Sequence, residues 1–155
     1  MPKAIPEGLH AVTPALTLDG AAEAIEIWKK AFGAEELMRA ADPSGKKIWH
    51  AAVRIRDSVI FCNDTFPEMP GAAPKQARLW LYQDGVDRAF QRAKDAGLKV
   101  VMPPADMFWG DRIAELHDRW GNQWVLAQHV KDLTPAEMKK AQDEFVAQQQ
   151  QQKKK

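Results

Sequence analysis

Histidine is the side chain of this chain best suited to bind a metal or to transfer a proton, and it occurs four times, as His10, His50, His117 and His129. No two of these histidines have the i, i+4 spacing of a helical metalloprotease motif. Cys62 is the only cysteine, which excludes an intrachain disulfide and a zinc site built from cysteines. The sequence also lacks a Ser-His-Asp or Cys-His pattern, so no familiar catalytic motif is present.

Aromatic and basic side chains alternate in two predicted strands. Alternate residues of a strand share one face, so Arg78, Trp80 and Tyr82 lie together. In the strand over residues 47–55, His50 and Arg54 share a face, and the opposite set, which includes Trp49, is apolar and suits packing against a helix. Aromatic rings stack on planar ligands, and arginine binds carboxylate or phosphate groups. These residue types favour the recognition of a planar or anionic organic molecule.

The same order of elements occurs twice along the chain. Helices are predicted over residues 21–32 and about 85–96, each followed by a glycine that ends it. Each helix follows one strand and precedes three strands, which predicts an α+β protein of two βαβββ modules. The modules span residues 9–64 and 77–130, joined by a proline-rich linker over residues 65–76. Strands are predicted over residues 10–18, 36–41, 47–55, 58–63, 77–83, 98–102, 113–117 and 122–128.

A third helix is predicted over residues 133–147. Thr134 and Glu137 form a capping-box pattern around Pro135, a common residue at the first helical position. The apolar stripe of this helix needs a partner, either its own sheet or a second subunit. Residues 148–155 contain only glutamine and lysine after the helix, and we expect a disordered tail.

Length and composition indicate a globular protein without unusual partners. The chain has 155 residues, 45% of them hydrophobic and 28% charged, with a formal net charge of +1. This balance favours neither nucleic acid nor an anionic membrane surface. No run of 18 apolar residues predicts a transmembrane span, and the N-terminal residues lack the apolar core of a secretion signal. We therefore expect a cytoplasmic protein that binds neither nucleic acid nor membrane.

Four stretches resemble a known superfamily: AAEAIEIWKKAFGAEELMR (residues 21–39), WHAAVRIRDSVIFCND (49–64), VMPPADMFWGDR (101–112) and HDRWGNQWVLAQHV (117–130). They are similar to the vicinal oxygen chelate superfamily, which includes glyoxalases, bleomycin-resistance proteins and dioxygenases. The FWGDR segment followed by D-x-x-G-x-x-W resembles its PhnB-type branch, which carries a demethylubiquinone-methyltransferase-like label. The resemblance implies that the two modules form a cupped mixed sheet with a pocket.

The resemblance also implies where a metal would be bound. Enzymes of the superfamily hold a divalent ion with histidine and glutamate side chains from different strands of the cup. The equivalent positions here are Thr13, Arg78 and Val125, with the fourth somewhere in residues 50–63. Valine has no ligand atom and arginine repels a cation, so we expect no metal and no cofactor.

Eight residues form the predicted ligand-binding site. Two of them, Trp109 and Arg112, come from residues 103–112, where a loop is predicted over residues 103–110. This segment could act as a lid or as a dimer contact. An ion pair between Asp111 and Arg112 is one possible way to fix this loop. Arg54 and Arg78 could instead each pair with a nearby acid, such as Asp57 or Glu115. The predicted set is Thr13, His50, Arg54, Arg78, Trp80, Tyr82, Trp109 and Arg112.

Three functions are compatible with these features. The first is a small-molecule-binding protein of the glyoxalase/bleomycin-resistance type that lacks the usual metal ligands and forms a homodimer. The second is a lyase, isomerase or dioxygenase with a relocated metal site that uses His50 with Glu115 or His129, or a metal-free relative with His50 or Tyr82 as acid–base. The third is an interaction module with a closed core. Because one fold hosts many activities, the resemblance alone does not choose among them.

Overall fold

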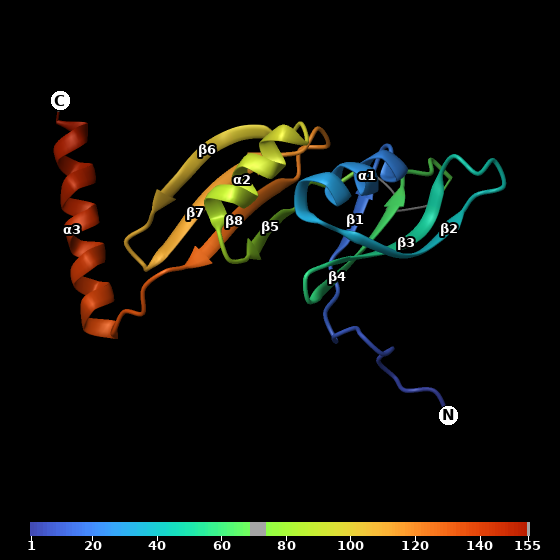
Figure 1. Cartoon of the computed structure of the whole chain (residues 1–155), viewed down its shortest axis with the longest axis horizontal. Helices are drawn as coiled ribbons and strands as arrows, with labels where there is room; N and C mark the ends of the chain where they lie inside the picture. The colour runs from blue at the N-terminus through green and yellow to red at the C-terminus, as the bar shows by residue number, and fades with distance from the viewer. Residues whose placement is uncertain (69–73, 155) are drawn as a thin grey trace.

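The computed structural model of the chain describes residues 1–68 and 74–154. Figure 1 shows two sheets side by side, each with one helix packed on it, and a third helix that stands apart at the C-terminus. The first module contains β1 (Ala15–Leu18), α1 (Ala21–Phe32), β2 (Glu35–Ala41), β3 (Ile48–Ile55) and β4 (Ser58–Asp64). The second contains β5 (Arg78–Tyr82), α2 (Val86–Asp95), β6 (Lys99–Asp106), β7 (Asp111–His117) and β8 (Gln123–His129), and α3 (Pro135–Lys153) follows it.

The two modules have the same topology. The strand orders are β1-β4-β3-β2 and β5-β8-β7-β6. In each sheet the first strand is parallel to the last, and the other pairs are antiparallel. The α+β fold of two βαβββ modules, predicted from the repeated pattern, is therefore confirmed. Of the predicted linker, residues 69–73 lie outside the described residues.

The helix of each module begins in the same way. The Asp64 side chain at the end of β4 accepts hydrogen bonds from the backbone N–H groups of Gly20 and Ala21, at 2.8 and 2.9 Å. The side-chain oxygen of Gln128, near the end of β8, accepts from Gly85 and Val86 at 3.1 and 3.2 Å. These bonds satisfy donors that a helix start leaves unpaired, and they tie each helix to the last strand of its own sheet.

One hydrophobic core joins the modules. Helices α1 and α2 contact each other, and the core between helices and sheets includes the fully buried rings of Trp28 and Trp124. The buried carboxylate of Asp118 accepts hydrogen bonds from both indole N–H groups, at 3.4 and 3.0 Å. Trp120 adds a bond from its indole N–H to the Asp19 carbonyl, at 2.6 Å. The Asp118–Trp120 turn of the second module thus holds the helix side of the first.

Two strand boundaries differ from the prediction because of proline. β1 begins at Ala15 rather than at residue 10, since Pro14 has no N–H to donate, and its carbonyl accepts only the Phe61 N–H at 2.8 Å. Val12, which lies in the predicted strand but precedes β1, is 85% exposed. β6 runs on through Pro103 and Pro104 to Asp106, where a loop was predicted, because an edge strand tolerates missing donors on its solvent side.

A bulge changes the orientation of Trp49. Ala40 pairs with His50 and Ala41 pairs with Ile48, so Trp49 is an extra residue in β3. The bulge buries Ile48 and leaves Trp49 53% exposed, whereas alternation alone predicted that Trp49 packs against the helix. From Ala51 on, the predicted alternation holds, with Val53 and Ile55 in the core.

Helix α3 is longer than predicted. It begins with the predicted capping box between Thr134 and Glu137, and it continues to Lys153, so residues 148–153 are helical rather than disordered. Glutamine and lysine have good helix propensity, which allows the helix to extend through them. None of residues 135–153 is buried. Within the described residues, no helix is both long and apolar enough to cross a membrane.

Candidate functional site

Three aromatic side chains gather on the open face of the second sheet, the face turned away from α1 and α2. The ring centroid of Trp80 lies 6.1 Å from that of Tyr82 and 6.4 Å from that of Trp109. Trp80 and Tyr82 come from β5, and Trp109 comes from the turn between β6 and β7. Trp80 is 40% exposed and Tyr82 is 53% exposed. We call Trp80, Tyr82 and Trp109 the aromatic group.

A buried carboxylate holds two members of the aromatic group. Oδ2 of Asp111 accepts hydrogen bonds from the Tyr82 hydroxyl at 2.8 Å and from the Trp109 indole N–H at 3.0 Å. Its Oδ1 lies 2.9 Å from Nδ1 of His129, whose Nε2 lies 2.7 Å from a carboxylate oxygen of Asp132. Asp111 therefore fixes the positions of Tyr82 and Trp109 beside Trp80.

The hydrogen bonds at Asp111 set the protonation states of the cluster. Burial would raise the pKa of Asp111, but bonds from His129, Tyr82 and Trp109 outweigh it and hold that pKa below its ordinary value. The bond to Asp111 raises the pKa of the Tyr82 hydroxyl, and the bonds to Asp111 and Asp132 raise the pKa of His129. Tyr82 thus keeps its proton at neutral pH, which suits a hydrogen-bond donor rather than a general base.

A cavity of about 220 Å³ lies where the modules meet, beside Trp80. Its walls are the N-terminal segment that precedes β1, the turn end of the β3–β4 hairpin, and β5 with Trp124 behind it. Most of its lining is apolar, and Thr13 is part of it although no strand carries that residue. The lining residues used below are Val12, Thr13, Ile60, Leu79, Trp80 and Leu81.

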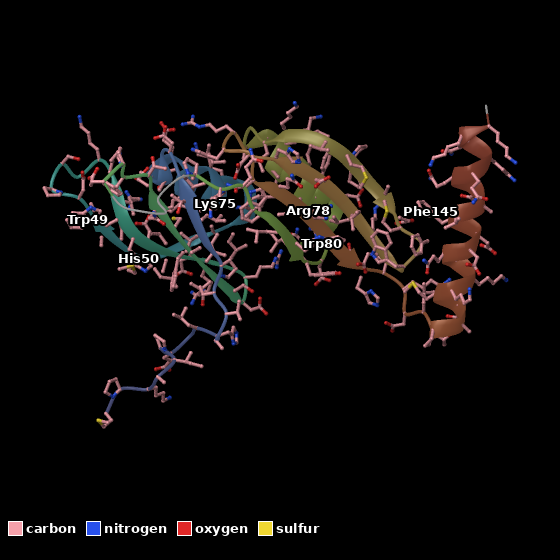
Figure 2. All side chains as sticks on the ribbon, turned by 180° about the vertical axis from the view of Figure 1, so that it is seen from behind. Trp49, His50, Lys75, Arg78, Trp80 and Phe145 are labelled. Carbon is pink, nitrogen blue, oxygen red and sulfur yellow. The ribbon has the colours of Figure 1, made fainter. Side chains whose placement is uncertain are left out.

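The structure separates the basic residues of the predicted site. Arg78 lies on the open face of β5, with its guanidinium 5.9 Å from the Trp80 ring and its Nε 3.3 Å from Glu115 (Figure 2). Arg54, on the first sheet, pairs with Glu35 at 2.6 Å. Arg112 does not lie on the open face of the second sheet. Successive residues of β7 point to opposite faces, and the neighbouring Asp111 points to the open face. The Arg112 guanidinium instead pairs with two acids, Asp87 and Asp106, at 2.9 and 3.1 Å.

His50 lies on the first sheet, away from the aromatic group (Figure 2). Its ring meets that of Phe61 edge to face, with centroids 4.6 Å apart. Glu115 is bonded to Arg78, and His129 is bonded to Asp111, so neither forms a pair with His50. Among residues 1–68 and 74–154, no three His, Cys, Asp or Glu side chains converge as metal ligands would.

The turn that carries Trp109 is fixed to the end of β8. The Gly110 carbonyl accepts the N–H groups of Val130 and Lys131 at 2.9 and 3.0 Å, and the Gly110 N–H bonds the Met107 carbonyl at 3.2 Å. A Cβ on Gly110 would lie only 2.2 Å from the Lys131 carbonyl oxygen, so only glycine fits. Phe108 contacts Phe145 of α3, with ring centroids 5.1 Å apart. These bonds favour a rigid wall over a lid.

The sequence prediction missed two members of this site, Asp111 and His129. Asp111 was expected to pair with Arg112, its neighbour in the sequence, but adjacent residues of a strand point to opposite faces. Strict alternation from Ile113 back to Asp111 would have placed Asp111 on the open side. His129 was considered as a partner of His50, whereas its ring bonds Asp111 of β7 and Asp132, which follows β8.

Comparisons with known proteins agree with this architecture. A chain from Mycobacterium bovis described as uncharacterized is 38% identical over 139 residues, covering 84% of this chain and 91% of that protein. The crystal structure of TioX from Micromonospora sp. ML1 has a TM-score of 0.63 at 22% identity, covering 81% of this chain and 100% of that one. A PhnB protein from Bacillus cereus has a TM-score of 0.57 at 18% identity, covering 77% and 99%.

The likeness to these solved structures shows the fold alone, because the identities are low. The sequence model of the Glyoxalase/Bleomycin resistance protein/Dioxygenase superfamily matches residues 9–126, which contain both βαβββ modules almost completely. With its repeated topology, its shared core and this match, the chain belongs to the glyoxalase/bleomycin resistance protein/dioxygenase superfamily.

Proposed function

We propose that the protein binds a small organic molecule with a planar apolar part, at the cavity between the modules and against the ring of Trp80. The observation that carries this proposal is the position of Trp80, which lines the 220 Å³ cavity and also belongs to the aromatic group. Ligand pockets are concave and mostly apolar, with few polar groups that orient the ligand. This cavity is small by that standard, which favours a ligand of one or two rings.

Arg78 and Thr13 are the polar groups that would orient the ligand. Arg78 donates only its Nε to Glu115, and its terminal nitrogens have no hydrogen-bond partner in the described part of the chain. An anionic substituent of the ligand would therefore bind at Arg78, above the Trp80 ring. The other arginines predicted for this role, Arg54 and Arg112, are already bonded to carboxylates and are not included.

The proposed binding does not use a metal. The residues at the ligand positions implied by the superfamily do not fit a divalent cation: Val125 is buried without a donor atom, and Arg78 is positively charged. Thr13 precedes β1 in a segment without regular structure. Stacking and shape require no ion, so binding is compatible with this residue set.

We also propose that two copies of the chain associate through their open faces. Apolar side chains on both sheets remain more than one-third exposed, namely Leu37, Met38, Trp49, Trp80 and Tyr82. Large exposed apolar patches mark interaction sites, and a second copy would bury these residues. Light scattering coupled to gel filtration would test this, and a monomer mass of about 17.4 kDa at all concentrations would refute it.

The experiment for ligand binding compares two exposed tryptophans. Native protein, Trp80→Ala and Trp49→Ala would be titrated with planar aromatic carboxylates and with matched uncharged analogues, and binding followed by calorimetry. Trp49 is the control because it is also exposed, at 53% against 40%, but lies on the other sheet. We expect binding to the native protein and to Trp49→Ala but not to Trp80→Ala. Equal binding by both variants would exclude the proposed site.

Arg78→Gln would separate the two parts of the ligand. Loss of the Arg78 guanidinium should weaken the binding of the carboxylates and leave the binding of the uncharged analogues unchanged, since only the charged group bonds the guanidinium. Treatment of the protein with a chelator should change neither the affinity for the carboxylates nor the affinity for the uncharged analogues. A loss of ligand affinity after chelation, restored by a divalent ion, would favour the metal-dependent enzyme instead.

A further inference from the structure

Three arginines gather around a hollow on the helix side of the molecule, separate from the open faces. Arg56 comes from the β3–β4 turn, and Arg88 and Arg92 come from α2. The hollow has a volume of about 280 Å³, and the end of α1 and residues 83–85 complete its lining. It therefore lies at the contact between the two modules.

These guanidinium groups have no acidic partner. Within the described residues, the arginines that lie within 4.0 Å of a carboxylate are others, such as Arg39, Arg78 and Arg112. Asp84 is the one acid that lines the hollow, so three positive charges face one negative charge. The hollow therefore carries an excess of two positive charges.

The backbone of Arg56 has a conformation that residues other than glycine rarely adopt. Arg56 has φ of 57°, and it is the non-glycine residue with positive φ in the described chain. Ile55 pairs with Ser58, so Arg56 and Asp57 form a two-residue hairpin turn, where glycine is the usual residue for positive φ. Residues held in such conformations cluster at functional sites.

An unpaired donor lies next to Arg56. Nη2 of Arg56 donates to the side-chain oxygen of Gln83 at 3.3 Å, which fixes the amide. Nε2 of the same Gln83 is buried and has no hydrogen-bond partner in the described residues. This donor is shielded from the hollow, so Gln83 contributes to the site by holding Arg56 through its side-chain oxygen.

The other two arginines have different roles. The Arg88 side chain folds back over Gly85, at the start of α2. Its guanidinium lies so close that a Cβ added to Gly85 would be 3.0 Å from Nη2 of Arg88. Arg92 donates to the carbonyls of Lys30 and Lys29 at the end of α1, at 2.7 and 3.3 Å, so it mainly contributes charge. The positive end of the α2 dipole adds to the attraction for an anion.

We propose that this hollow binds a phosphate group, either as the free ion or on a small phosphomonoester. Arg56 and Arg88 would bond the phosphate oxygens, and Arg92 would add positive charge. Asp84 opposes the binding. This phosphate site does not depend on the ligand-binding role proposed for the 220 Å³ cavity, because no residue that lines the hollow also lines that cavity.

The test is calorimetric titration with inorganic phosphate and with glycerol 3-phosphate, at constant ionic strength set with chloride. Arg88→Gln should lose about tenfold or more in affinity, because it removes a charge-assisted hydrogen bond. Arg56→Gly should lose affinity to a similar degree while keeping or raising the melting temperature, since glycine relieves the positive φ. Asp84→Asn should bind phosphate more tightly. Arg39→Gln is the control, as it removes an arginine that pairs with Glu36.

The two phosphate arms identify the ligand: equal affinity supports the free ion, and tighter binding of the ester supports a phosphorylated metabolite. Absence of phosphate binding by the native protein would overturn the proposal. So would equal losses in Arg39→Gln and Arg88→Gln, which would indicate only general attraction by charge. Binding of a single-stranded oligonucleotide without binding of phosphate would also overturn it, and would identify the surface as one for a polyanion.

Discussion

Replacement of Asp111 tests whether this carboxylate positions the aromatic group. In Asp111→Ala, the Tyr82 hydroxyl and the Trp109 indole N–H both lose their acceptor, the Asp111 carboxylate, which lies 2.8 and 3.0 Å from them in the native protein. A hydrogen bond to a charged group contributes about 1.5–3 kcal/mol, and water can replace it at the half-exposed Tyr82. We therefore expect a loss of about 3 kcal/mol in the free energy of unfolding. For a chain of this length, that corresponds to a melting temperature about 6–12 °C lower.

Asp111→Asn should be much milder and should change the pH dependence. The asparagine oxygen can accept both bonds at Oδ2, and its amide then faces Nδ1 of His129, which accepts when the ring is neutral. We expect a loss of about 1 kcal/mol. In the native protein the hydrogen bonds to Asp111, and to a smaller degree to Asp132, raise the pKa of His129. The stability that protonated His129 contributes is therefore full below about pH 6.5, and it is lost as the pH rises through the raised pKa. The free energy of unfolding of Asp111→Asn should therefore fall less than that of the native protein as the pH rises.

The assay is thermal and urea unfolding of the native protein and both variants, at about pH 5.5 and about pH 9. Tyr82→Phe alone and combined with Asp111→Ala completes a double-mutant cycle that isolates the 2.8 Å bond. The reasoning would be refuted by equal losses in the alanine and asparagine variants at both pH values. It would also fail if Tyr82→Phe and Asp111→Ala were additive.

Three further predictions concern the frame around the site. Asp118→Ala should cost about 4 kcal/mol or more and lower the yield of folded protein, because two indole donors of Trp28 and Trp124 become buried without an acceptor; urea unfolding measures this. Gly110→Ala should cost more than about 2 kcal/mol in the same assay, since its Cβ would lie 2.2 Å from a carbonyl oxygen, and a change within error would refute the close approach. Burial raises the pKa of the Cys62 thiol to about 12, so thiol reagents at neutral pH should label it only in urea, and rapid labelling of native protein would contradict the burial.

Much of the fold could be predicted because it depends on neighbouring residues. Alternation in β5 places Arg78, Trp80 and Tyr82 on one face, and by the same rule the partly buried Leu79 and Leu81 pack against the core on the other face. Alternation failed where the backbone departs from regular pairing, as at the Trp49 bulge. It also failed at the β6 prolines, which are tolerated only because β6 is an edge strand, and strand order is not visible in the sequence.

By itself, the sequence determined the repeated βαβββ order, the ends of the first two helices and the aromatic side of β5, because spacing and local conformational preference decide these features. Only the tertiary structure decided which side chains meet. Asp111 contacts Tyr82, 29 positions earlier, and His129, 18 positions later, since β5 and β7 both flank β8. The three arginines of the hollow likewise come from a hairpin turn and a helix of different modules. Such contacts depend on the packing of distant segments, which no local pattern encodes.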